Sequence, residues 1–379
     1  MVTPKKHILV VSDPPAAPGY LPRLRYMCDY LVKHGFRVTL LTEAYQPIVF
    51  EHSYPVMEIL MYSGGMSDWA FKTAWTLISD WHNRVFAQRA LTALEGKRFD
   101  IVLCTAFSDF PLGAAQRIAA RYRIPLICDI RDLDEQVDDS HYQYRHLSWW
   151  TRPFRRIYRS IHIRRRNKVL RAADAVTTVS LWHVDFIKRL NPETYLVYNG
   201  YDEAQFYPDN VRTDVFRLTY IGSLFEWQQQ ALEKVRAVIG AMNAETPRYR
   251  IELDIHTPQN DPVPHTQLGD TIRRSSVMLV LTNPATHGML TTKFYEAFGC
   301  AKPVLCVPSD NGALAELIRY TNAGIATDDE KKIKQFLALR YNEWKRQGFT
   351  RQDCMLRELF SRAQQTLVLE EIIRKVLQK

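Results

Sequence analysis

The sequence predicts an α/β protein with two doubly wound parallel-sheet domains. Short apolar runs alternate along the chain with helical patterns, which is typical of βαβ units and of the parallel sheets they build. The chain has 379 residues, which is more than one ordinary hydrophobic core holds. Polar residues and glycines collect just after several predicted strands, where doubly wound sheets bind their ligands.

The first domain is predicted over residues 1–200 and begins with a βαβ unit. Its first strand is HILVV, and a proline-rich loop follows it. The next segment has Leu24, Met27 and Leu31 at spacings of three and four, which predicts a helix, and the strand FRVTLLT completes the unit. The later elements of this domain are a strand at 100–106, a helix at 113–123 and strands at 125–132, 175–180 and 195–200.

The second domain is predicted over residues 201–360, and its first part, 202–216, is interpreted as a linker. The elements that follow are a strand at 217–224, a helix at 229–243, strands at 250–256 and 277–282, a helix at 292–300 and a strand at 303–309. A long amphipathic helix is predicted from Met355 to Leu377. Residues 361–379 are assigned to a C-terminal helical segment that can cross back to the first domain.

Cysteine usage and hydropathy favour a cytoplasmic protein. None of the six cysteines has CxxC or zinc-ligand spacing, and several lie in apolar runs. The apolar run at 8–11 is too short for a signal peptide, and no stretch reaches the ~18 apolar residues of a membrane span. We therefore expect a reducing compartment, no disulfide framework and no structural metal.

One segment carries a charge equal to the whole formal net charge of +9. Residues 149–171 contain eight arginines and one lysine and no acidic residue. Phe154, Ile157, Tyr158 and Ile161 form an apolar stripe between these arginines, which favours peripheral contact with an anionic surface such as the inner membrane face. A helix packed on the first domain with a solvated basic face is the alternative. No nucleic-acid partner is expected, because no nucleic-acid-binding fold accompanies the charge.

The segment TTKFYEAFGCAKPVL predicts a helix whose N-terminus meets an anion. Thr291 and Thr292 are good N-cap residues. Lys293 lies in the first turn, where the helix dipole disfavours a cation unless an anion is bound. Glu296 follows three residues later and therefore lies on the same helix face. An ordinary amphipathic helix with a capped start is the alternative interpretation.

Polar residues also follow three other predicted strands. Gly222 and Ser223 end the strand LTYI, and a glycine there would let a phosphate approach the backbone. Arg131 and Asp132 follow the strand PLICDI, where an arginine can neutralise negative charge. A tight turn and a salt-bridged strand end are the respective alternatives. The loop after the first strand contributes Asp13, Gly19 and Tyr20, and its prolines equally suit a plain rigid loop.

Five segments, taken in their order along the chain, resemble the GT-B glycosyltransferases. They specifically resemble the large retaining family that uses nucleotide sugars, which is often called family 4. The segments begin HILVVSDPP, FDIVLCTAF, AADAVTTVS, LTYIGSL and TTKFYEAFG, and together they span nearly the whole chain. The resemblance implies a GT-B fold with two Rossmann-like domains and a cleft between them. The first domain would bind the acceptor, and the second would bind the nucleotide-sugar donor.

The resemblance implies transfer of a sugar from a nucleotide diphosphate donor, UDP or GDP, to a hydroxyl of a glycan or lipid-linked acceptor. It implies retention of configuration, no metal or other cofactor, and a place in the synthesis of surface polysaccharide or glycoconjugates. The motif Asp132-Leu133-Asp134 lies in the acceptor half and is not expected to bind a metal.

The resemblance also assigns roles to residues. The predicted catalytic residues are Arg131, Asp132 and Lys293. The predicted acceptor-binding residues are Asp13, Gly19 and Tyr20. The predicted donor-binding residues are Gly222, Ser223, His287, Gly288, Leu290, Thr291, Thr292, Lys293 and Glu296, with Glu296 accepting hydrogen bonds from the ribose.

Two departures from the family pattern leave other functions open. Gly288 stands where the family has the first glutamate of its signature, and GSLFEWQQQ lacks the Arg and Lys that hold the diphosphate in many members. A catalytically degraded GT-B protein that acts as a scaffold or partner is one alternative. A sugar-nucleotide epimerase of the same fold is another.

Overall fold

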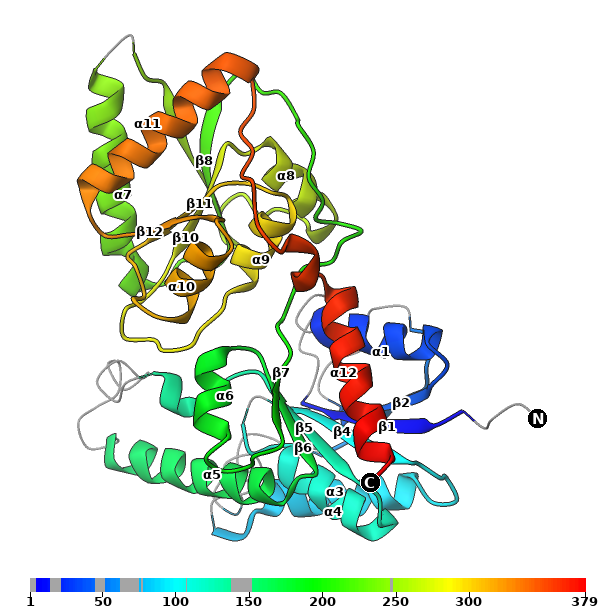
Figure 1. The fold of residues 1–379 in the computed structure, drawn as a ribbon. Coiled ribbons are helices and arrows are strands. Elements are labelled where there is room, and N and C mark those ends of the chain that lie inside the picture. Colours follow the sequence, from blue (N-terminus) through cyan, green and yellow to red (C-terminus); the bar gives the residue numbers. More distant parts are fainter. Residues whose placement is uncertain are drawn as a thin grey trace. The chain divides into compact units, whose positions relative to one another are not determined.

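A computed structural model of the chain describes residues 5–13, 22–44, 52–61, 75, 78–106, 108–137, 152–245 and 248–379. The chain divides into two compact units (Figure 1). Unit 1 comprises Met1–Tyr198 and Thr366–Lys379, and unit 2 comprises Asn199–Gln365. Across the described ranges, we find no helix with the length and apolar character that a membrane crossing needs.

Unit 1 is built on a parallel sheet whose strand order is β3-β2-β1-β4-β5-β6-β7 in the described part of the chain. The winding direction reverses beside β1, as in doubly wound folds, and all carboxyl ends meet at one edge. The strands are β1 (His7–Ser12), β2 (Arg37–Glu43), β3 (Val56–Ile59), β4 (Ile101–Ala106), β5 (Leu126–Ile130), β6 (Ala175–Thr178) and β7 (Thr194–Leu196).

Helices cover both faces of this sheet (Figure 1). Successive side chains of a strand point to opposite faces, so Ile8 and Val10 of β1 face one layer while Leu9 and Val11 face the other. The first layer contains α1 (Pro22–Lys33) and the end of α12 (Arg362–Leu377). The second contains α3 (Trp81–Ala93), α4 (Leu112–Tyr122), the end of α5 (Arg152–Ala172) and α6 (Leu181–Ile187). A short 3-10 helix, η1 (Asp134–Gln136), follows β5.

Unit 2 has a second parallel sheet, with the order β12-β11-β10-β8-β9 among its described residues. The strands are β8 (Phe216–Ile221), β9 (Ile251–His256), β10 (Val277–Leu281), β11 (Val304–Val307) and β12 (Gly324–Ala326). The helices are α7 (Gln229–Ala244), α8 (Leu268–Arg274), α9 (Thr292–Gly299), α10 (Ala313–Tyr320) and α11 (Glu330–Gln347), with 3-10 turns η3 (Glu226–Gln228), η4 (His265–Gln267) and η5 (Arg357–Phe360). The predicted fold class, two doubly wound parallel α/β domains, is confirmed.

The C-terminal helix differs from its prediction, because it begins at Arg362 and not at Met355. Leu356 has a left-handed backbone with φ 57°, which interrupts any helix through this segment. The backbone at Phe360 and Arg362 instead bonds Tyr201, with Tyr201 N–H donating to Phe360 O (3.1 Å) and Arg362 N–H donating to Tyr201 O (2.8 Å). The 3-10 turn η5 and a single strand-like bridge between Tyr201 and Ser361 therefore replace the first turns of the expected helix.

The segment 202–216 also differs from a bare linker, although most of it is irregular. Phe206 is only 1% exposed, and Gln205 O accepts a hydrogen bond from Arg273 Nη1 (2.9 Å). Gly269 allows this close packing, because a Cβ there would lie 2.4 Å from Gln205 O. Residues 205 and 206 are thus packed into unit 2.

Candidate functional site

The start of α9 carries the polar residues that the sequence singled out. Thr291 caps the helix, because its Oγ1 accepts a hydrogen bond from the backbone N–H of Lys293 (3.4 Å). Phe294 and Phe298 are fully buried on one side of α9. Lys293 and Glu296 remain only partly covered on another side. Thr292 is exposed at the helix N-terminus.

The side chain of Lys293 reaches back to the end of β8. Its Nζ donates a hydrogen bond to the hydroxyl of Tyr220 (3.0 Å) and lies 4.5 Å from the centre of that ring. Burial lowers the pKa of Lys293 to about 8, and the nearby charge of Glu296 opposes this shift. The structure therefore places a cation, at neutral pH, beside the carboxyl end of a central strand.

Gly222 lies directly under this lysine. A Cβ at position 222 would stand 2.4 Å from Lys293 Cε and 2.8 Å from Nζ, and Gly222 has φ +130°. The φ angle favours glycine at this position, and a Cβ would also displace the flexible end of the lysine from where it lies. The backbone N–H of Gly222 donates to His256 O (2.9 Å), while Ser223 is exposed and its carbonyl accepts from the Tyr220 hydroxyl (2.6 Å).

Glu296 faces this lysine from the next turn of α9. Burial raises the pKa of Glu296 to about 7, while the charges of Arg362 and Lys293 oppose the shift. Within the described ranges, no donor forms a hydrogen bond to this carboxylate. A half-covered acceptor without a protein donor is suited to bind hydroxyl groups of a ligand.

The loop before α9 contains the remaining predicted donor-binding residues. Leu290 and Gly288 are buried, whereas His287 is exposed. Gly288 has φ +66°, a left-handed conformation in which a glutamate would be strained. The local backbone thus explains the glycine at this position.

Unit 1 brings together three of its predicted site residues. Arg131 Nη2 bonds both carboxylate oxygens of Asp13 (2.7 and 2.9 Å) just beyond the carboxyl ends of β5 and β1. Burial raises the pKa of Asp13, and the charge and hydrogen bonds of Arg131 oppose this shift. Asp132 is half-buried, and this desolvation raises its pKa; it accepts a hydrogen bond from Gln136 Nε2 (3.1 Å). Gly19 and Tyr20 lie outside the described residues.

Sequence reasoning missed Tyr220, Gln136 and Arg362. Tyr220 occurs in the apolar run LTYI and reads as an ordinary core residue. Gln136 accepts a hydrogen bond from Leu133 N–H (3.3 Å), and its Oε1 lies 2.9 Å from His183 Nε2. The Leu133–Gln136 bond is local to η1, but the contacts of Gln136 with His183 and of Tyr220 with Lys293 join separate elements, so the local sequence does not predict them.

The helix α5 separates its basic residues between two faces. Arg166 is 1% exposed and pairs with Glu135 (2.5 Å), and Arg159 donates to the carbonyl of Val137 (3.0 Å). Arg164 and Lys168 are exposed. Ile157 is 59% exposed, so part of the predicted apolar stripe faces solvent. The side chain of Phe154, also in that stripe, is not among those that the structure describes.

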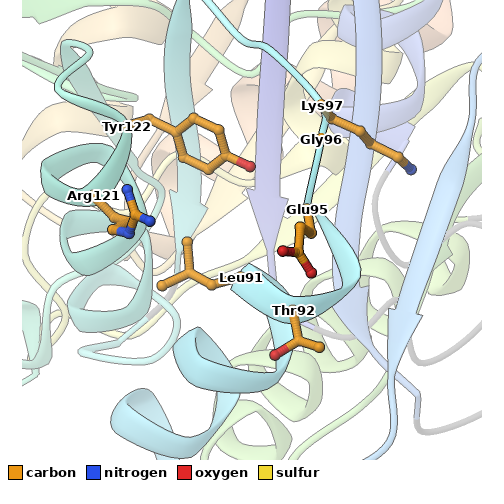
Figure 2. A pocket seen from close by; sticks show the side chains of 7 residues that line it. All are labelled: Leu91, Thr92, Glu95, Gly96, Lys97, Arg121 and Tyr122. Carbon is orange, nitrogen blue, oxygen red and sulfur yellow. The ribbon is translucent and has the colours of Figure 1, made fainter.

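A cavity of about 360 Å³ lies elsewhere in unit 1 (Figure 2). It opens between the ends of α3 and α4 and the segment that leads into β4, which is the amino edge of the sheet. None of the predicted site residues contributes to it. The lining residues are Leu91, Thr92, Glu95, Gly96, Lys97, Arg121 and Tyr122. In the parts of the chain that the structure covers, no group of His, Cys, Asp and Glu could hold a metal ion.

Comparisons with known proteins agree with this architecture. Residues 19–200 match the glycosyl transferase 4-like domain family. A glycosyltransferase from Rickettsia africae ESF-5 superposes with a TM-score of 0.58 at 11% identity, over 99% of each chain. The apo lipopolysaccharide outer core galactosyltransferase WaaB gives 0.61 at 10% identity, over 98% of this chain and 99% of that one.

A co-structure of S. aureus MnaA with UDP gives a TM-score of 0.52 at 10% identity, over 98% of this chain and 97% of that one. No curated protein matches the chain by sequence. The family model confirms the predicted glycosyltransferase resemblance over residues 19–200, and the solved structures confirm the GT-B fold.

Proposed function

We propose that this chain, a glycosyltransferase of the GT-B type with a glycosyl transferase 4-like domain at 19–200, uses a nucleotide diphosphate sugar as its donor. One observation carries the proposal: the ammonium of Lys293 stands over Gly222 at the N-terminus of α9. A helix N-terminus, a lysine and a side-chain-free stretch of backbone together suit a diphosphate.

The leaving diphosphate gains negative charge as its bond to the sugar breaks. Lys293 and the N-terminal dipole of α9 would stabilise this charge without a metal, and the hydroxyls of Thr291 and Thr292 can add hydrogen bonds. Glu296 would accept hydrogen bonds from the ribose. Ser223 and the loop with His287, Gly288 and Leu290 would complete the donor site. We propose UDP or GDP as the nucleotide.

Unit 1 would supply the acceptor side of the reaction. Arg131 and Asp132 are proposed as catalytic residues near the transferred sugar, and Asp13, Gly19 and Tyr20 as acceptor contacts. The pairing of Asp13 with Arg131 supports a joint role, because the carboxylate fixes the guanidinium in place. We propose that the reaction retains the configuration of the sugar.

The acceptor is proposed to be a glycan or lipid-linked hydroxyl in the synthesis of surface polysaccharide or glycoconjugates. The exposed basic face of α5 supports peripheral contact with the cytoplasmic face of a membrane. The fold shared with a lipopolysaccharide galactosyltransferase is consistent with such an acceptor.

Thermal unfolding with UDP-glucose, GDP-mannose and ADP-glucose tests the donor site. At ~100 times the dissociation constant, a bound donor stabilises the fold by about 2.7 kcal/mol, and one of these compounds should do so. Lys293→Ala and Glu296→Ala should each abolish most of the shift. Lys331→Ala, an exposed lysine of α11, is the matched control and should keep it. If no nucleotide sugar stabilises the wild-type protein, the result contradicts the proposed function and supports the scaffold alternative.

A further inference from the structure

Tyr220 has a buried ring and a hydroxyl that both donates and accepts hydrogen bonds. Its ring is 0% exposed, in the core between β8 and its neighbours. The hydroxyl accepts a hydrogen bond from Lys293 Nζ (3.0 Å), and its proton has two acceptors, Ser223 O (2.6 Å) and the more distant Gln228 Oε1 (3.4 Å). The hydroxyl proton is therefore used on the side of these acceptors, which turns an oxygen lone pair toward the lysine.

We propose that Tyr220 is a positioning residue for donor binding, because its hydroxyl fixes the Lys293 ammonium where the diphosphate arrives. This inference rests on the proposed function and adds a residue to it. Tyr220 does not itself contact the donor in this proposal. It acts through the lysine.

A lysine needs such a partner because its four-carbon stem is flexible. Holding the ammonium in one place costs conformational entropy, and a lysine already held before the ligand binds has lost that entropy in advance. The ring of Tyr220 adds to the hold, because the ammonium lies 4.5 Å from the ring centre.

The held ammonium keeps donors for a ligand. An ammonium has three N–H donors, and Tyr220 takes one of them. No second hydrogen-bond acceptor for Lys293 Nζ occurs among the residues that the structure describes. The remaining donors lie over Gly222, where no side chain intervenes.

A double-mutant cycle separates positioning from simple core packing. We would measure the affinity for UDP, GDP and ADP by calorimetry in the wild type, Tyr220→Phe, Lys293→Ala and the double variant. Phenylalanine keeps the buried ring and removes only the hydroxyl. Tyr220→Phe should weaken the preferred nucleotide about tenfold, which corresponds to ~1.4 kcal/mol. In the Lys293→Ala background, the same substitution should have no further effect.

Tyr249→Phe removes a hydroxyl from the same hydrophobic core and should leave the affinity unchanged. Thermal unfolding without nucleotide confirms that each variant folds. The inference would be overturned if Tyr220→Phe changed the nucleotide affinity equally with and without Lys293, or did not change it at all. Nucleotide binding by the wild type would still uphold the proposed function in that case. A wild type that bound none of the three nucleotides would reject both.

Discussion

At the scale of single residues, Lys293 and Glu296 change charge in the same pH range. Burial brings the pKa of Lys293 down to about 8 and that of Glu296 up to about 7. Between these values, the lysine is mostly charged and the glutamate mostly ionised. This is the state in which one residue attracts a diphosphate and the other accepts hydrogen bonds from hydroxyl groups.

The affinity for the donor should therefore peak between about pH 7 and pH 8. As pH rises through the pKa of Lys293, the ammonium loses its charge and affinity falls. As pH drops through the pKa of Glu296, the carboxyl gains a proton, accepts hydrogen bonds less well, and affinity falls again. Calorimetric titrations with a nucleotide sugar measure this profile, because its diphosphate does not titrate in that range.

Two variants assign the limbs of this profile. Lys293→Arg should flatten the alkaline limb, since arginine stays charged, and Glu296→Gln should flatten the acidic limb. A wild-type affinity that is constant across the range would contradict the assignment.

The sequence predicted that Thr291 caps a helix and that Lys293 and Glu296 share one helix face, because capping and helical spacing are local properties. It could not predict the partner of Lys293, since Tyr220 is far away in the chain and looks like a core residue. The same limit applies to Gly222. The sequence explains this glycine by the close approach of a phosphate, whereas the structure adds the side chain of Lys293, which a Cβ at position 222 would contact.

At the scale of secondary-structure elements, α5 shows how one helix divides its charges. Arg166 is buried against Glu135 and contributes to the packing of unit 1. Arg164 and Lys168 lie four residues apart on an exposed face, where they can contact anionic lipid headgroups. The charge count of the sequence could not separate these two groups, because the separation depends on which face packs on the sheet.

Reversing the exposed charges should weaken membrane binding without unfolding the helix. Each basic residue near an anionic surface contributes about 1 kcal/mol, so Arg164→Glu with Lys168→Glu should lower binding to phosphatidylglycerol vesicles at least tenfold. Lys331→Glu with Lys332→Glu, on the exposed side of α11, is the matched control. Vesicle co-sedimentation measures the difference, and equal binding by both double variants would count against α5 as the contact surface.

Element boundaries were predictable where a strong local signal exists. The strands β1 and β4 and the helices α4 and α9 lie within one or two residues of their predicted ranges. The predicted start of α12 was wrong, because the left-handed backbone of Leu356 and the pairing of Ser361 with Tyr201, a residue distant in the sequence, interrupt the helical pattern of 355–361.

At the scale of the whole molecule, the chain ends in the unit in which it began. Residues Thr366–Lys379 belong to unit 1, although Asn199–Gln365 form unit 2. Leu369, Ile372, Ile373 and Val376 of α12 join the core formed by α1 and one face of the sheet. The core of unit 1 is therefore complete only when the last residues of the chain are in place.

This arrangement predicts that a substitution near the C-terminus destabilises unit 1 alone. Ile373 is fully buried, and Ile373→Ala should lower the free energy of unfolding of unit 1 by about 2–5 kcal/mol. Ile333→Ala removes the same atoms from a fully buried site in unit 2 and should destabilise that unit by a similar amount. If each unit unfolds separately, scanning calorimetry resolves two unfolding transitions, and a nucleotide sugar identifies that of unit 2 by raising its temperature. Each substitution should then lower the temperature of a different transition. One cooperative transition lowered equally by both would show that the units unfold together, and that the core completed by α12 stabilises the whole chain.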